Sequence, residues 1–546
     1  MVGGPGTGRK SGANMTVDKR DMQGTEMPQT SQMIADYPEI LLHVIAELRG
    51  AFLNGENNKR AMIDSLVGQI TDPTSVLMAL QEITESSPDA RSALDLLLAE
   101  GGELREAKFS RQFGGIRQMG PAKLEREQPW HTPESVAELL YYYGLIGRGF
   151  KGAGQGAHTV IYVPSDVLPW LPQPKSADGE QGLAVTPVPP PPASRMLRLD
   201  DALLEDTGTL LGFLHTEGLR LQTNGAPDTE DVDRLMVRLY SAHGYVSPLA
   251  TSDESTNLAE LRLGLLLHAA KRLGWLRRAD DDRVRLTGNR VHAFLEQTRS
   301  EQRFTLWEAW RTSPEWNDLE RTPGLDCSAG NWRNNPLQTR EAVLQLLGRL
   351  QAGAWYSQAD VINAIKETQP DFQRPTGDYD SWPIRDGISN EVLRGFEQWE
   401  RVEGALLRFL LNGPLYWLTA VELAEPSAGD DLLLSLSGLG ARWLGQEGEV
   451  PEETGRPPID VAENFTVQLA PSTPLMDRFR VERFSSWQAS YPRFVYQINQ
   501  RSLKRAAEEG VPPDRILAFL RARARTMPER VTAGLKRFGE QLEAAV

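Results

Sequence analysis

The chain has 546 residues, 40% of them hydrophobic, with a net charge of −15 and one cysteine. This length exceeds what one hydrophobic core usually serves, so several domains are expected, and a lone cysteine excludes a disulfide framework. No apolar run approaches the roughly 18 residues of a membrane helix and no apolar leader opens the chain, so we expect a cytoplasmic protein without membrane contact.

Charge is distributed unevenly along the chain. Residues 465–546 hold 14 Lys and Arg against 8 Asp and Glu, a balance of +6, so the remainder, with 45 basic and 66 acidic residues, carries −21. A basic terminal block behind an acidic body suits either a nucleic acid or an acidic protein partner, and composition leaves both open.

The first 34 residues lack periodicity and are predicted to form a disordered tail. A glycine-rich run near Gly6 and Gly8 resembles a phosphate loop. However, Arg9 stands where that loop places its lysine, and no strand precedes the run, so it is interpreted as part of the tail.

Residues 35–72 contain two apolar stripes at helical spacing, separated by a hinge around Gly50 and Gly55. Lys59 and Arg60 open the second stripe. The arrangement resembles a SAP-type helix–hinge–helix, in which such cations meet DNA phosphate; the alternative is a helical hairpin with solvated cations.

Three later segments share one pattern: an apolar helix that stops at a glycine, a strand, a turn and a returning strand. The glycines are Gly144, Gly274 and Gly413, spaced 130 and 139 residues apart. Residues 73–172, 198–300 and 301–445 are therefore predicted as three winged-helix-like domains.

Some details of these domains can be predicted as well. Thr132 is expected to cap the helix before Gly144, and Leu415–Leu418 is expected to be the strand after Gly413. Residues 173–197, with four consecutive prolines, are predicted as a stiff linker, and residues 446–459 as a second linker.

A DNA-reading module would present cations on its third helix and wing. The first wing carries Arg148 and Lys151. The second helix–wing junction is richer in cations, from Lys271 to Arg278, but Asp280–Asp282 at its tip would repel phosphate. Direct DNA contact and a scaffold role both remain open.

Residues 460–546 are expected to alternate strands at 465–469 and 494–498 with helices, one of them capped by Ser502. The block resembles the N-terminal accessory domain of XPB-family helicases, most closely at Tyr496-Gln497-Ile498 and Met527-Pro528. The array as a whole resembles the winged-helix subunit of TFIIH. In that subunit a similar domain pairs with the helicase, so the resemblance implies an XPB-like helicase partner in trans.

No sequence signal for catalysis is found. The helicase motor's phosphate loop is missing, the seven histidines never lie within five residues of each other, and Cys327 has no nucleophile context. We therefore expect no catalytic residue, metal, cofactor or small-molecule substrate.

The predicted fold class is mainly α with small β wings (α+β), in tandem winged-helix-like domains followed by a small α/β accessory domain. The predicted function is a non-catalytic, DNA-associated or helicase-accessory protein; the alternative is a protein-interaction scaffold without DNA contact. In the terminal block, the candidate contacts with DNA or a partner are Arg501, Lys504, Arg505, Arg521 and Arg525.

Overall fold

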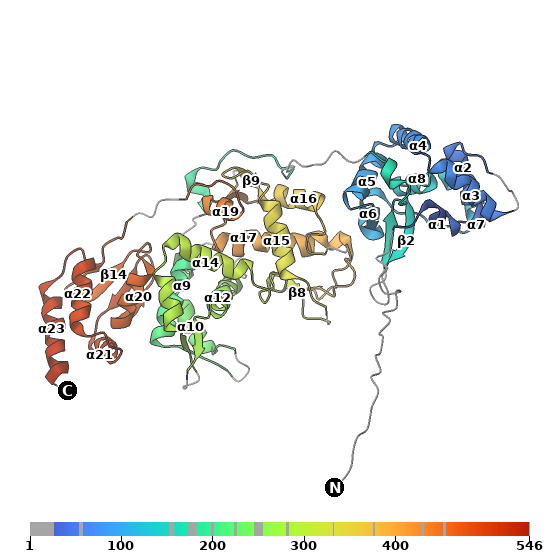
Figure 1. Cartoon of the computed structure of the whole chain (residues 1–546). Coiled ribbons are helices and arrows are strands. Elements are labelled where there is room, and N and C mark those ends of the chain that lie inside the picture. The colour runs from blue at the N-terminus through green and yellow to red at the C-terminus, as the bar shows by residue number, and fades with distance from the viewer. Residues whose placement is uncertain are drawn as a thin grey trace, which may run out of the picture. The chain divides into compact units, whose positions relative to one another are not determined.

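The computed structural model describes residues 27–544, except 54–57, 152–157, 173–182, 198–200, 223–225, 245–254, 280–282, 331, 375–376, 427–430 and 451–454. The chain divides into two compact units: Met1–Gly179 with Thr376–Asp378, and Glu180–Pro375 with Tyr379–Val546 (Figure 1). Helices predominate and the sheets are small and antiparallel, so the chain is of mixed α and β class. The glycine-rich run at 3–11 lies outside the described residues.

Unit 1 begins with four helices, α1 (Thr30–Ala35), α2 (Glu39–Arg49), α3 (Lys59–Ile70) and α4 (Pro73–Ser86). Helix α1 contradicts a tail that extends to residue 34, because Met33 and Ile34 are buried and Thr30 donates two hydrogen bonds to Asp166. Helices α2 and α3 share a core with Val160 and Tyr162. They are therefore not a separate SAP-like module, because their apolar faces are buried in one cluster with residues from the rest of unit 1.

The rest of unit 1 is a six-element motif of helix, strand, two helices and two strands. Its strands form a sheet in the order first, third, second. The elements are α5 (Pro88–Ala99), β1 (Glu103–Arg105), α6 (Glu106–Phe113), α8 (Val136–Tyr142), β2 (Gly147–Lys151) and β3 (His158–Tyr162), with α7 (Pro121–Glu127) and the 3₁₀ turn Pro129–His131 inserted before α8.

The glycine stop after α8 is confirmed, because Gly144 has a φ of 68°, in the left-handed region that favours glycine. The predicted cap is wrong by three residues. Ser135, rather than Thr132, accepts the hydrogen bond from the Glu138 backbone N–H, because the chain becomes helical only at Val136.

Unit 2 repeats the six-element motif twice, each time with the same sheet order. The second motif is α9 (Ala202–Thr216), β5 (Leu219–Arg220), α10 (Thr229–Arg238), α12 (Ser255–Arg272), β6 (Leu276–Arg278) and β7 (Arg283–Leu286), with the short α11 (Ser241–Gly244) between α10 and α12. Gly274, like Gly144, has a φ of 68°. Helices α13 (Gly288–Leu295) and α14 (Arg299–Arg311) follow.

The third motif is α15 (Pro336–Leu347), β9 (Trp355–Ser357), α16 (Gln358–Thr368), α17 (Ala405–Asn412), β11 (Val421–Ala424) and β12 (Leu433–Leu436). Its expected strand at Leu415–Leu418 is wrong. Pro414 opens a short helix, α18 (Pro414–Trp417), and the chain becomes extended only after Thr419, whose φ is 63°. β8 (Leu325–Asp326), which precedes the motif, pairs with β10 (Arg385–Asp386) between α16 and α17, and α19 (Gly438–Trp443) follows β12.

The proline-rich segment is not a free linker where it is described. Val188 pairs with Trp355 at one edge of the third sheet, and β4 (Met196–Leu197) pairs with β11 at the other edge. Leu183 is buried in the main core of unit 2. Sheet edges have unpaired backbone groups, so a neighbouring extended strand of the same chain binds them readily.

The C-terminal block forms a four-stranded sheet in the order β13-β14-β16-β15. Asn499, rather than Ser502, is the N-cap of α21, and β13 and β15 were not predicted. The elements are β13 (Asp460–Val461), β14 (Thr466–Leu469), α20 (Leu475–Phe484), β15 (Ser486–Ala489), β16 (Phe494–Gln497), α21 (Gln500–Glu508), α22 (Pro513–Arg523) and α23 (Glu529–Ala544).

Helix α9 of the second motif packs directly against α20 of the C-terminal block (Figure 1). Two glycines of α9 permit the approach: a Cβ on Gly208 would lie 2.8 Å from Leu475, and one on Gly212 would lie 2.8 Å from Glu482. The C-terminal block is therefore held to the second motif along a buried helix pair.

A buried guanidinium crosses this helix pair. Arg478 of α20 donates from Nη1 to a carboxylate oxygen of Glu205 at 2.9 Å, and its guanidinium lies 3.5 Å from the centre of the Phe494 ring. Glu205 also accepts a hydrogen bond from Arg299. Each of these charges is thus paired inside the protein.

Candidate nucleic-acid interface

The cations predicted to contact DNA from the N-terminal helices differ in their availability. The ammonium of Lys59 donates to the backbone carbonyl of Ala35 at 2.7 Å and so helps to hold α1 on α3. The side chain of Arg60 is 85% exposed, and its nearest carboxylate is Asp64 at 3.5 Å. Of the two, Arg60 is the more available to a phosphate, because its pair with Asp64 is exposed to solvent.

The cations of the first hairpin, β2–β3, are neutralised within unit 1. Arg148 Nε lies 2.8 Å from a carboxylate oxygen of Glu106, and Lys151 Nζ lies 2.6 Å from one of Glu103. Glu103 belongs to β1 and Glu106 opens α6, and β1 lies on the other side of β3 from β2 in the same sheet. Because a phosphate would have to displace a carboxylate, this hairpin is a poor site for DNA.

In the C-terminal block, Arg505 has a structural role. Its guanidinium donates to the carbonyls of Glu482 and Ser485, at 3.0 and 2.8 Å, and thereby closes the end of α20. Arg525 pairs with Asp460 at 3.2 Å although its side chain is 68% exposed. Neither guanidinium is free of a protein partner.

Three candidates in the same block remain available. Arg501 and Lys504 are exposed on α21 and lie on one face of it, since residues three apart in a helix are neighbours. Arg521 is exposed at the end of α22. None of the three has an ion-pair or hydrogen-bond partner among the described residues.

A further set of cations gathers where α12 meets the β6–β7 hairpin of the second motif. Arg290, from α13, turns back onto this junction: its guanidinium lies against Gly274 and donates weakly to the Leu273 carbonyl at 3.5 Å. Lys271 and Arg277 are exposed, and Arg277 Nε donates to the Leu286 carbonyl.

Lys271, Arg277 and Arg290, here called the elbow, have no carboxylate partner in the part of the chain that is described. The sequence indicated the density of cations at Lys271 and Arg277. It could not indicate Arg290, which reaches Gly274 only because α13 follows β7 directly and folds back. An array of unneutralised cations can bind successive phosphates of a nucleic-acid backbone.

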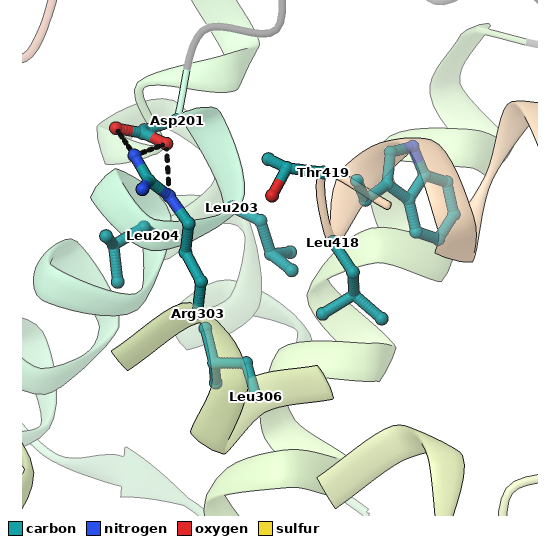
Figure 2. Close-up of a pocket in the computed structure, with 8 residues that line it drawn as sticks. Asp201, Leu203, Leu204, Arg303, Leu306, Leu418 and Thr419 are labelled. Carbon is teal, nitrogen blue, oxygen red and sulfur yellow. Dashed lines mark hydrogen bonds and ion pairs between the residues drawn. The ribbon is translucent and has the colours of Figure 1, made fainter. Parts of the chain in front are cut away.

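A small pocket of unit 2 lies between α9, α14 and the Leu418–Thr419 turn. Asp201 and Arg303 form its charged side, joined by hydrogen bonds that include one of 2.8 Å, and leucines form its floor (Figure 2). Its volume is about 10 Å³, room for about one water molecule. This pocket is a small gap between packed helices and is too small for a ligand.

A histidine and a serine in unit 2 lie at hydrogen-bonding distance: His268 Nε2 is 2.7 Å from Ser313 Oγ. The serine is fully buried, and its hydroxyl donates to Glu315 and accepts from the Trp316 N–H. Burial and the positive charge of Arg321 lower the pKa of His268. A nucleophile must reach its substrate, so this buried hydroxyl is engaged in structure rather than poised for attack.

Two further features bear on chemistry. Burial raises the pKa of the Cys327 thiol to about 12, which disfavours the reactive thiolate at neutral pH. Among the described residues, no group of three or more His, Cys, Asp or Glu side chains is arranged to hold a metal ion.

No protein-family profile matches the chain, and no curated protein matches it significantly. Within the described residues, no helix combines the length and apolar character needed to cross a membrane.

Proposed function

We propose that this protein is a non-catalytic, DNA-associated accessory protein in which winged-helix domains carry a basic helicase-associated domain. The observation that carries the proposal is the six-element motif. Its three copies share the element order and the first-third-second strand order, which is the arrangement expected of a winged helix. The resemblance of the C-terminal block to the XPB accessory domain adds an XPB-like helicase as a second expected partner.

Charge favours unit 2 as the part that contacts DNA. The elbow and the C-terminal cations Arg501, Lys504 and Arg521 present basic groups without carboxylate partners in the described structure. The chain as a whole carries −15, so binding would depend on these local groups and would weaken steeply with salt.

The test is binding of the full chain to labelled duplex and single-stranded DNA, followed by fluorescence anisotropy over a salt titration. We expect Arg501→Glu/Lys504→Glu to weaken binding at least tenfold and to reduce the slope of log K against log salt by about two. The matched control, Arg333→Glu/Arg394→Glu, changes net charge equally at two exposed positions elsewhere in unit 2 and should leave affinity within twofold. Equal losses in both variants, or no DNA binding at low salt, would refute direct contact by this block.

A scaffold that binds only proteins is the second candidate, and one observation favours it. The hairpin cations Arg148 and Lys151, which a DNA-reading winged helix would need, are paired with Glu106 and Glu103. If no DNA binds at low salt, while a purified XPB-type helicase forms a complex with the full chain, the scaffold function is supported instead.

A further inference from the structure

Unit 1 contains an open cleft that the proposed function does not use. Its volume is about 660 Å³, within the range of ligand sites in proteins. The walls come from the α4–α5 junction, the end of α6, the turn Pro129–His131 and the start of α8. These segments are far apart in sequence, and the packing of unit 1 brings them together.

The floor of the cleft is apolar and aromatic. Phe113, Trp130 and Tyr143 line it and are at least nine-tenths buried, and Leu139 and Val136 add partly exposed aliphatic surface. The indole Nε1 of Trp130 is buried without an acceptor among the described residues. Such a floor accepts a hydrocarbon chain and presents aromatic rings that attract cations.

The rim of the cleft is polar, and its charge is negative. Asp89 and Glu134 line it, and no described lysine or arginine is among the lining residues. The Asp89 carboxylate is exposed and has no partner in the described structure. Glu134 is bound by Arg117, but that guanidinium also binds Glu138, so two carboxylates share one cation.

We propose that this cleft binds a peptide segment of a partner protein that carries a lysine or arginine beside an apolar residue. The long stem of such a side chain fits the aromatic floor while its charged head meets Asp89 and Glu134. A nucleic acid is disfavoured, because its phosphates would face two carboxylates and no lining cation. The inference does not depend on DNA binding by unit 2.

The experiment uses the full chain and two fluorescent probe peptides, one alternating leucine with lysine and one alternating leucine with glutamate. We expect the lysine peptide to bind and the glutamate peptide to fail. Asp89→Asn/Glu134→Gln should weaken binding of the lysine peptide at least fivefold. The control Asp64→Asn/Glu125→Gln removes the same charge from α3 and α7 of the same unit and should change affinity less than twofold.

Hydrogen exchange then locates the site. Protection of residues 86–90 and 129–139 by the lysine peptide would support the cleft, and circular dichroism would verify that each variant is folded. The inference would be overturned by equal weakening in both variants, by equal binding of both peptides, by no binding of the lysine peptide, or by protection confined to other residues. Protection of the same residues by duplex DNA instead of the peptide would also overturn it.

Discussion

The first and second six-element motifs have the same element order and the same strand order, yet their surfaces differ in charge. In the first, the hairpin cations are neutralised by carboxylates of β1 and α6, and the open cleft is acidic. In the second, the cations of the elbow have no carboxylate partner among the described residues. A shared arrangement of helices and strands thus fixes neither the charge of the surface nor what binds there.

The two motifs also differ in their first helix. Helix α9 is buried almost entirely, because α20 of the C-terminal block packs on the side that the motif itself leaves open. Helix α5 of the first motif keeps several exposed and half-exposed residues. The Arg478–Glu205 pair of unit 2 therefore lies in a buried interface, whereas the Arg148–Glu106 pair of the first motif is partly exposed.

The largest expected effect separates a buried from a surface ion pair. Arg478→Ala leaves Glu205 without one of its partners inside the α9–α20 interface, and we expect a loss of about 3–5 kcal/mol in the free energy of unfolding. Arg148→Ala breaks a partly exposed pair and should cost less than about 1 kcal/mol. Urea unfolding followed by tryptophan fluorescence measures both, and similar losses would erase the distinction.

The next effect concerns glycines in helices. Gly212→Ala places a Cβ 2.8 Å from Glu482 and should destabilise unit 2 by about 1–3 kcal/mol. Gly68→Ala, in α3 of unit 1, meets nothing within 4 Å and should stabilise its helix by up to about 1 kcal/mol. Thermal unfolding compares the two. A neutral Gly212→Ala would mean that α20 does not pack closely on α9.

A third effect sharpens the contrast in charge. Lys271→Gln/Arg277→Gln/Arg290→Gln removes the elbow cations and should weaken DNA binding at least tenfold at low salt, because up to three phosphate contacts are lost. Arg148→Gln/Lys151→Gln removes cations that are already paired and should weaken it less than twofold. Anisotropy with one labelled duplex measures both, and the reverse ranking would make the first hairpin the DNA-contacting one.

The smallest effect is a difference in pH dependence between buried carboxyl groups. Burial raises the pKa of Glu205, so the folded state takes up a proton at this carboxylate more readily than the unfolded state. The contribution of Glu205 to the free energy of unfolding therefore rises as the pH falls from 7 toward 5. Burial alone would also raise the pKa of Glu138, but hydrogen bonds from Arg117 and the backbone hold it below its ordinary value. That stabilisation is present above about pH 4.3 and is lost only at lower pH.

The unfolding midpoint at pH 5 minus that at pH 7 tests this sign. In Glu205→Gln this difference should be smaller than in the unaltered chain, by no more than about 2 °C. In Glu138→Gln the difference should be unchanged. A larger pH difference in Glu205→Gln than in the unaltered chain would show that the sign is wrong.

The sequence by itself determined the local features of this protein. The sequence predicted the helical spacing of apolar residues, the glycine stops at Gly144 and Gly274, and the returning strand of each hairpin. These features were predictable because backbone propensity and periodicity act over a few residues. The cations Arg501, Lys504 and Arg521, which the sequence predicted as contacts with DNA or a partner, are exposed in the structure. The predictions for the cap of α8 and for the strand after Gly413 were each wrong by a few residues. In both places a second residue or segment a few positions later could serve equally well, Ser135 as the cap and Val421–Ala424 as the strand.

Only the tertiary structure decided which charges are free and which segments are joined. Glu103 neutralises Lys151 from 48 residues away, and Arg478 meets Glu205 from 273 residues away. The proline-rich segment became part of a sheet because the third motif offers two unpaired edges to it. These outcomes depend on which surfaces bury each other, and burial sets both the cost of an unpaired charge and the availability of a paired one.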